Sequence, residues 1–480
     1  MTLIFPCLRN AFLIFLIAIL AGCGKRKTPV ELGIQNGTLH VGIGAEPQSL
    51  DPHLTTGEIE HTIQKSLFEG LLIPDGKTGE PSPGVASHWE VSDDHTIYTF
   101  HLRPEATWSD GRPVTAQDFI YSFRRALSPA LAAKAAIQFY YVEGAKDYGE
   151  GVINDFSDVG FKALDNQTLQ VSLLHPFPHM LKLAMHSSWM PVRVDEIEKY
   201  GRIDERGTKW TMPGNLVGNG PFNLTNWKQN DLIQVSKSAT YWDAEQVMLN
   251  EIYFYPIDNV NSEERAFRSG RLHLTNYSSG LPLSRLDYYL EEQADHMWLK
   301  SISRNYFLLI NPENAPFDDV RVRRALSLVL DREALADQVM KGVWTPAYNL
   351  VPPGLSGYEA GKQFESDPEK ARQLLSDAGF PNGEGFPSVD LVFPPRGDNQ
   401  RFLEAIQAHW KTELGIHVSI TQMEWKVWLD VLKEGDYSLS IDGWNLNNAH
   451  LSCLSPVVWK ATFCGLTIPS INCLMKRPKR

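Results

Sequence analysis

The side chains of this sequence that could do chemistry do not form a familiar catalytic pattern. There is no G-x-S-x-G nucleophile motif, no H-E-x-x-H zinc motif, no phosphate-binding P-loop and no paired C-x-x-C. The 14 histidines lack metal-ligand spacing, and the carboxylates are too scattered to indicate a paired acid and base. Gly42-Ile43-Gly44 lacks the third glycine of a dinucleotide-binding turn. The sequence therefore predicts a binding protein and not an enzyme, with no metal and no cofactor.

The cysteines lie only near the two ends of the chain. Cys7 and Cys23 belong to the N-terminal segment, whereas Cys453, Cys464 and Cys473 lie close to the C-terminus. No cysteine lies between Cys23 and Cys453, so the body of the chain can form no internal disulfide. Packing alone must stabilise that body if the protein is exported.

Residues 1–23 have the pattern of an export signal. An apolar run from Ala11 to Ala21 follows Arg9 and is too short to cross a membrane comfortably. It ends in Leu20-Ala21-Gly22-Cys23, which resembles the bacterial lipobox. We expect Cys23 to be lipidated and residues 24–37 to tether the folded body to a membrane. An uncleaved signal anchor is the alternative.

Composition limits the class of partner. The 480 residues are 43% hydrophobic and carry a formal charge of −12, with no basic stripe. This length suits two or three globular domains, and the acidic balance argues against nucleic acid as a partner.

Hydrophobic periodicity predicts a mixed α/β fold. A capping box formed by Thr115 and Asp118 predicts a helix through Leu127, and Asp367-Pro368 predicts the start of another. Apolar residues at helical spacing predict two further helices, near residues 322–329 and 402–410. Alternating apolar residues predict strands at 39–43, 96–102, 168–173, 232–235, 252–255 and 416–420.

Seven segments carry a family resemblance. They are GAEPQSLDPH (44–53), FEGLL (68–72), PGVASHWEVSDDHTIYTFHLR (83–103), WSDGRPVTAQDFIYSFRR (108–125), GNGPFNLTNW (218–227), TYWDAEQV (240–247) and APFDDVRVRRALSLVLDREAL (315–335). In this order they resemble family 5 of the bacterial extracellular solute-binding proteins, the oligopeptide-, dipeptide- and nickel-binding components of ABC importers. The resemblance is closest to the oligopeptide-binding branch and runs from about Thr38 to about Trp444.

The resemblance implies a two-lobed, periplasmic-binding-protein-like fold of type II, with three α/β domains and a hinge. It implies a monomer of the periplasm or cell envelope that closes on a peptide and delivers it to an ABC permease in the inner membrane. The implied boundaries are 38–75 with 200–298 for domain I, 76–199 for domain II, 299–450 for an incomplete domain III, and 451–480 for an aberrant tail.

The resemblance also suggests ligand-binding residues. Trp425 and Trp444 match tryptophans that form pocket walls, and the backbone around Gly443 matches a peptide-pairing strand. Tyr306 and Phe307 match an aromatic pair that lines the site. The alternative for all of these aromatic residues is that they are buried core.

Two departures from the family pattern bear on function. The family commonly places an aspartate three residues after the second tryptophan to pair with the α-amine of the peptide, but this chain has Asn447 there. Either the ligand is not a free-amine peptide or the alignment slips. After His450 the resemblance stops. A one-base shift from Cys464 onward permits a W-x-D-N-P-E-Y stretch similar to the family, so we interpret the tail as translated out of frame.

Several alternatives stay open at this point. The same fold could bind dipeptides, cell-wall peptides or a metal chelate, and the chain could be a non-functional, truncated remnant. An exported peptide hydrolase would need a nucleophile or metal site that the sequence does not show. A chaperone-like or adhesive lipoprotein could use the same cleft.

Overall fold

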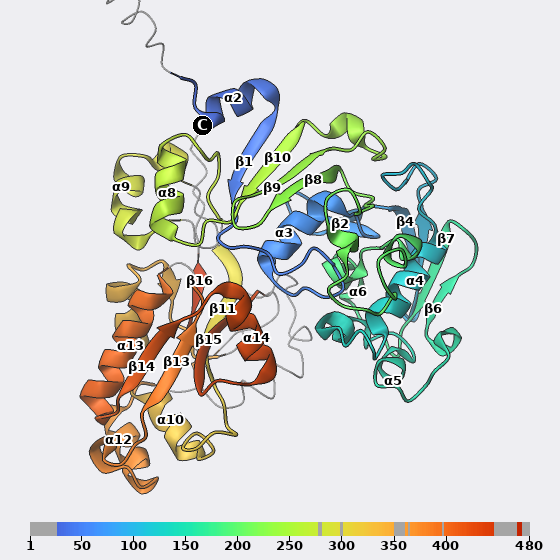
Figure 1. Cartoon of the computed structure of the whole chain (residues 1–480). Helices are drawn as coiled ribbons and strands as arrows, with labels where there is room; N and C mark the ends of the chain where they lie inside the picture. Colours follow the sequence, from blue (N-terminus) through green and yellow to red (C-terminus); the bar gives the residue numbers. More distant parts are fainter. Residues whose placement is uncertain are drawn as a thin grey trace, which may run out of the picture.

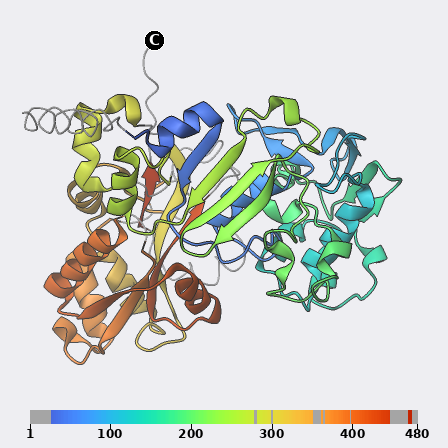
Figure 2. The same cartoon turned by 45° about the horizontal axis from the view of Figure 1, so that its top comes forward.

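The computed structural model describes residues 26–276, 281–297, 301–349, 361–362, 365–395, 398–445 and 468–472. Cys23, Asn447 and most of the tail lie outside these residues. The described chain is a mixed α/β protein with three main sheets (Figure 1), as the sequence predicts. The first sheet lies between the other two, with the second sheet on one side and the third on the other (Figure 2).

The first sheet joins strands that are far apart in the sequence. Its order is β1 (Thr38–Gly42), β10 (Glu251–Tyr255), β9 (Leu232–Lys237) and β8 (Phe222–Lys228), with β1 parallel to β10 and the other pairs antiparallel. Helix α3 (Glu58–Leu67) packs on this sheet and buries one apolar face, made of Ile59, Ile63 and Leu67, in the same core as Ile233 and Val235. Helices α2 (Pro29–Asn36), α8 (Val260–Arg268) and α9 (Leu286–Glu291) complete this part of the molecule.

The second sheet is antiparallel and lies within one continuous stretch of chain. Its order is β4 (Ala86–Val91), β5 (Ile97–Leu102), β7 (Thr168–Ser172) and β6 (Phe161–Ala163). Helix α4 (Ala116–Leu127) covers it, and an aromatic cluster around Trp189 fills the core. A two-stranded ribbon, β2 (Leu72–Pro74) with β3 (Pro81–Pro83), and the short helices α5 (Ala145–Gly149), α6 (Met180–Leu183) and α7 (Val194–Ile197) flank it.

The third sheet has helices on both faces. Its order is β12 (Trp344–Thr345), β16 (Ile468–Asn472), β11 (Ser301–Ile310), β15 (Leu439–Asn445), β13 (Val389–Phe393) and β14 (Val418–Gln422). Strands β13, β14 and β15 run parallel to one another, and β15 is antiparallel to β11. Helices α10 (Val320–Leu328), α12 (Pro368–Asp377) and α13 (Asn399–Leu414) share a core with one face, and α14 (Trp425–Glu434) packs on the other. A three-residue helix, α11 (Arg332–Ala334), follows α10.

The local predictions from the sequence are confirmed. All six predicted strands form, and Thr115 and Asp118 make the two reciprocal bonds of a capping box at the start of α4. Asp367 caps α12 through the Lys370 amide, with Pro368 in the first turn. Each of these signals acts within a few residues, which explains why they can be read without the fold.

Buried charges join the first and second sheets. The guanidinium of Arg125 on α4 is fully buried and binds both carboxylate oxygens of Asp51, at 2.9 and 2.6 Å. The Arg125 Nη1 atom also lies 3.0 Å from His53 Nδ1. Because the charges of the pair are removed from water together, losing either partner would leave an uncompensated buried charge. This ion pair fixes α4 against the segment that follows β1.

Candidate functional site

The edge of strand β15 is the first feature that could bind a ligand. On one side, β11 pairs with all of β15, from Arg304 opposite Asn445 to Ile310 opposite Leu439. On the other side, β13 pairs only with Leu439 and Ser440. Among the described strands, none pairs with residues 441–445 on that side. Unpaired backbone donors and acceptors of a strand edge are a template for an added strand.

Two of the predicted site residues lie on this edge. Gly443 sits opposite Tyr306, and the backbone of Trp444 sits opposite Asn305. The amide of Gly443 donates a 2.7 Å hydrogen bond to its neighbour Asp442 Oδ1. The third predicted residue of this stretch, Asn447, lies outside the described residues, so its assignment stays a prediction.

The predicted aromatic pair on β11 is buried and divided between two faces. Tyr306 stacks on Trp344, with ring centroids 5.1 Å apart, inside the core between the sheet and α13. Phe307 is also buried but does not belong to that core cluster. Neighbouring residues of a strand point to opposite faces of a sheet. The two rings therefore do not form one continuous wall.

Trp425 lies where the third sheet meets the first. Glu424 accepts hydrogen bonds from the amides of Lys426 and Val427, which starts helix α14 at Trp425. The Trp425 ring packs beside Trp428, and the Trp428 indole N–H donates to Ser440 Oγ on β15 at 3.0 Å. Both tryptophans are buried in the apolar cluster that contains the buried face of α3. Trp425 thus closes the junction between α14 and α3.

A buried carboxylate lies at the same junction. Glu60 on α3 is almost fully buried and accepts a 2.8 Å hydrogen bond from the Gln48 amide. Burial raises the pKa of Glu60 and outweighs the hydrogen bonds from Gln48 and Trp425 and the charge of Lys426, which lower it. The Gln48 side chain also donates a 3.4 Å bond to Asp430 on α14. Sequence reasoning missed this group, although a carboxylate between Ile59 and Ile63 on an apolar helix face was the available signal.

A lysine beside the second sheet is influenced by charges on β15 and α14. Lys134 begins the 3₁₀ turn Lys134–Phe139. Burial lowers its pKa, as do Lys433 and Arg206, while the charges of Asp442 on β15 and Asp430 on α14 raise it. These effects place Lys134 close to both elements. Lys134, from the part of the chain that carries the second sheet, is therefore electrostatically coupled to β15 and α14.

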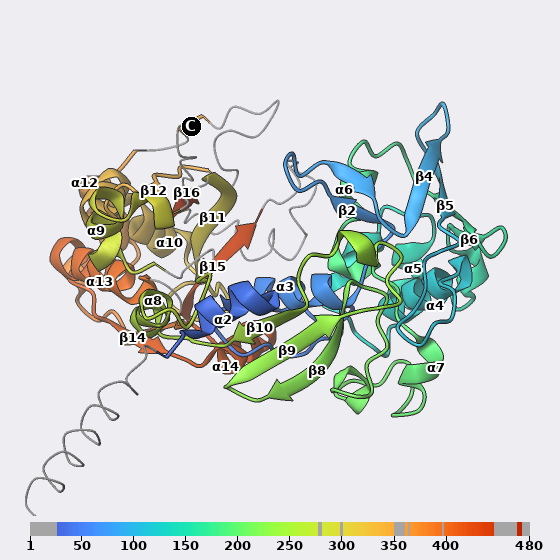
Figure 3. The ribbon, with the colours of Figure 1, turned by 90° about the horizontal axis from the view of Figure 1, so that it is seen from above.

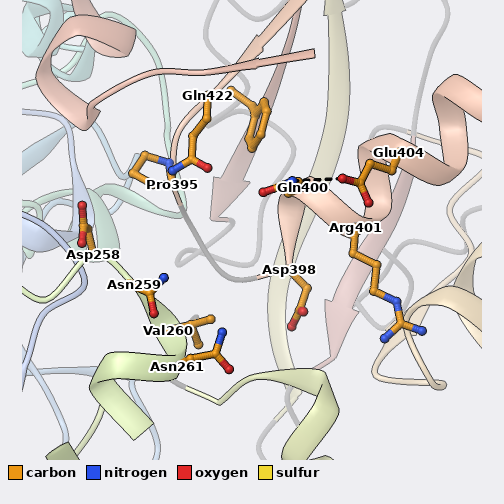
Figure 4. Close-up of a pocket in the computed structure, with 11 residues that line it drawn as sticks. Asp258, Asn259, Val260, Asn261, Pro395, Asp398, Gln400, Arg401, Glu404 and Gln422 are labelled. Atoms are coloured by element: carbon orange, nitrogen blue, oxygen red, sulfur yellow. Dashed lines mark hydrogen bonds between the residues drawn. The ribbon is translucent and has the colours of Figure 1, made fainter. Parts of the chain in front are cut away.

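The pocket of Figure 4 lies at the same end of the third sheet but on another side. It has a volume of about 350 Å³ and opens between the N-termini of α8 and α13, at the carboxyl ends of β13 and β14. Burial raises the pKa of Asp398, which accepts a hydrogen bond from the Leu283 amide. None of the predicted site residues lines it. The lining residues are Asp258, Asn259, Val260, Asn261, Phe393, Pro395, Asp398, Gln400, Arg401, Glu404 and Gln422.

The described part of the chain offers neither a metal site nor a membrane-spanning helix. Within it, no group of three or more histidine, cysteine, aspartate or glutamate side chains is placed to hold a metal ion. Within the same residues, no helix has the length and apolar character needed to cross a membrane.

Known proteins share this arrangement. Residues 80–452 match the family described as bacterial extracellular solute-binding proteins, family 5. The chain belongs to this family. The periplasmic oligopeptide-binding protein OppA of Escherichia coli is 35% identical over 440 residues, which cover 89% of this chain and 79% of OppA.

Solved structures of family 5 proteins agree with the fold. The murein tripeptide-binding protein MppA of E. coli superposes with a TM-score of 0.81 at 29% identity, covering 88% of this chain and 82% of MppA. OppA of Haemophilus influenzae, in complex with the peptide RPPGFSPFR, gives a TM-score of 0.79 at 30% identity. The match covers 87% of this chain and 82% of that OppA chain. These matches confirm the two-lobed periplasmic-binding-protein-like fold.

One comparison concerns the arrangement of the lobes. The unliganded open form of MppA gives a TM-score of only 0.57 at 30% identity, covering 86% of this chain and 79% of that one. Because MppA has the same fold in both structures, the lower TM-score indicates that the lobes of the open form are arranged differently from those of this chain. The contacts of Trp425 with α3 therefore belong to an arrangement unlike that open form.

Proposed function

We propose that this protein is the substrate-binding lipoprotein of an ABC importer, that it captures oligopeptides between two closing lobes and that it delivers them to the permease. Lipidation at Cys23 would hold it at the membrane surface in the periplasm or cell envelope. The function is import and not catalysis, in keeping with a family of solute-binding proteins.

The observation that carries this proposal is the half-open strand β15. An extended peptide can pair with the backbone of residues 441–445 whatever its side chains are, because the hydrogen bonds involve only main-chain groups. Such pairing suits a receptor for peptides of varied sequence. The H. influenzae relative in complex with a nine-residue peptide supports the same class of ligand.

The shared apolar cluster supports closure. Trp425 and Trp428 on α14 lose contact with α3 if the third sheet swings away, so closure over a ligand buries apolar area that the open form exposes. The ligand and this contact then stabilise the same arrangement.

The direct test is to purify the full chain and identify what it holds. Mass spectrometry of small molecules released on denaturation should show a mixture of short peptides, and calorimetry should give binding of synthetic tri- to pentapeptides. Comparison of free-amine with N-acetylated peptides addresses Asn447, and dipeptides, murein tripeptide and nickel chelates test the alternatives. Absence of binding to all of them would contradict the proposal and favour a non-functional remnant.

Import and anchoring need separate tests. Cells that carry the gene and its permease should take up a labelled peptide, and Cys23→Ser should release the protein from the membrane fraction. Binding that persists without permease-dependent uptake would favour a chaperone-like or adhesive role.

A further inference from the structure

Helix α3 presents a polar face opposite its buried one. Ile59, Ile63 and Leu67 face the core of the first sheet, whereas Glu58, His61 and Lys65 recur at helical spacing on another side. Figure 3 shows α3 lying between the part of the molecule that carries β11 and β15 and the part that carries the second sheet. The polar face lies toward the second-sheet part, because the His61 ring on it contacts His186.

Lys65 on this face has no charged partner. Its side chain is exposed, yet among the described residues no carboxylate lies within 4 Å of its ammonium and no hydrogen bond holds it. Burial by the surrounding protein lowers the pKa of Lys65 more than the charge of Glu58 raises it. An ammonium that reaches solvent but has lost part of its hydration can pair with a carboxylate, which would offset that loss.

Two histidines form the wall beside Lys65. The His61 ring meets the His186 ring edge to face, with centroids 5.2 Å apart. His186 Nδ1 accepts from the Ser188 amide at 3.1 Å, and its pKa falls to about 3 through burial and through the charges of His61 and Lys65. The pKa of His61 falls to about 4, mainly through burial and then through Lys65. Both rings are neutral at pH 7, so Lys65 carries the charge of the cluster.

His61 adds an unused hydrogen-bonding atom. Its Nε2 is buried and has no hydrogen-bond partner among the described residues, which is costly for a polar atom. His61 precedes Lys65 by four residues, so the two side chains lie one above the other on α3.

We propose that Lys65 and His61 form a subsite for a carboxylate of the bound peptide. This inference rests on the proposed function and specifies a preference within it. The carboxylate could belong to an acidic side chain or to the C-terminus, and both would pair with the Lys65 ammonium. Glu58, three residues before His61, would repel a carboxylate at the N-terminal end of this face, so a carboxylate is attracted only at the Lys65 end. A lysine or arginine side chain at this subsite is disfavoured.

The test uses calorimetry on the full chain with tetra-alanine peptides. One set carries glutamate or glutamine at each position in turn, and a second set has the C-terminus free or amidated. The wild-type protein should bind one glutamate peptide at least tenfold more tightly than the matching glutamine peptide. Alternatively, amidation of the peptide's C-terminus should lower the affinity at least tenfold. The first result identifies a side-chain carboxylate and the second identifies the C-terminus.

Variants assign the preference to Lys65. Lys65→Met should abolish the preference, and Lys65→Arg should retain it. Lys146→Met, at an exposed lysine of the second-sheet part, serves as the matched control and should behave as wild type. Circular dichroism and thermal unfolding would verify that the variants fold.

The outcomes separate the subsite from the proposed function. The subsite is overturned if peptides bind but neither the glutamate-to-glutamine exchange nor C-terminal amidation changes the affinity. It is also overturned if Lys65→Met keeps the preference for the carboxylate. The proposed function, and the subsite with it, is overturned if no peptide binds the wild-type protein.

Discussion

The first sheet meets its two neighbours through different kinds of contact. Toward the second sheet, the junction contains the buried Arg125–Asp51 ion pair. The charge of Arg103 also acts there on the Glu69 carboxylate, which accepts hydrogen bonds from the Tyr241 hydroxyl at 2.5 Å and the Trp242 indole at 2.7 Å within the first-sheet part. Toward the third sheet, it contains the apolar rings of Trp425 and Trp428, the buried carboxylate of Glu60 beside Trp425, and a long hydrogen bond from Gln48 to Asp430.

The difference indicates which junction can open. Separating Arg125 from Asp51 would leave each buried charge without its partner, at a cost of several kcal/mol. Apolar faces can part and meet again because their attraction is not directional. We therefore interpret the first and second sheets as one rigid unit and the third sheet as the part that moves.

Breaking the rigid junction should have the largest effect. Arg125→Met leaves Asp51 buried without its partner and should lower the free energy of unfolding by about 3–5 kcal/mol. Urea unfolding followed by circular dichroism measures this. Arg112→Met removes an exposed arginine and should cost at most about 1 kcal/mol. Similar losses for the two variants would contradict the assignment of Arg125 as a fixed connection.

Two buried tryptophans sharpen the comparison. Trp189→Ala removes a ring from the second-sheet core and should cost about 3–5 kcal/mol with or without peptide. Trp425→Ala should cost less than half as much in the ligand-free protein, because its contact with α3 is lost on opening. It should weaken peptide binding at least tenfold, measured by calorimetry. Equal costs in the ligand-free protein would mean that the third sheet stays docked without ligand.

The rigid junction should also depend on pH. Burial raises the pKa of Glu69 to about 7, against hydrogen bonds from Tyr241 and Trp242 that lower it. A raised folded-state pKa means that Glu69 favours folding fully below about pH 4.5 and loses this contribution as the pH rises toward 7. Glu69→Gln should flatten that part of the stability curve by up to about 1.4 kcal/mol per pH unit.

Urea unfolding at pH 5, 6 and 7 measures the slope for Glu69→Gln. Glu245→Gln, at an exposed site of the β9–β10 connection, should leave the slope unchanged. An unaltered slope in Glu69→Gln would show that another group governs this pH range.

The smallest effect is expected at an exposed polar contact of the moving junction, between Gln48 and Asp430. Gln48→Ala removes the 3.4 Å bond to Asp430 but keeps the backbone amide that binds Glu60. An exposed bond of this length contributes little, so peptide affinity should change by about twofold or less. A tenfold loss in calorimetry would show that polar contacts, and not the tryptophans, hold the lobes closed.

The sequence by itself determined the elements and their ends. The capping box of Thr115 and Asp118 and the start of α12 at Asp367 depend on bonds between neighbours in the chain. The ordered motifs also indicated the family, which the comparisons confirm. The lipidation of Cys23, the role of Asn447 and the out-of-frame tail stay predictions, because they concern residues outside the described part.

Only the tertiary structure decided how the site is assembled. Tyr306 and Phe307 are neighbours in sequence, yet the sheet sends their rings to opposite faces. Among the described strands, β15 has an open edge because β13 ends at Phe393 while β15 runs on to Asn445. Trp425 meets α3, and His186 meets His61, across long stretches of chain. Local patterns encode bonds within a few residues, whereas these contacts depend on how distant segments pack together.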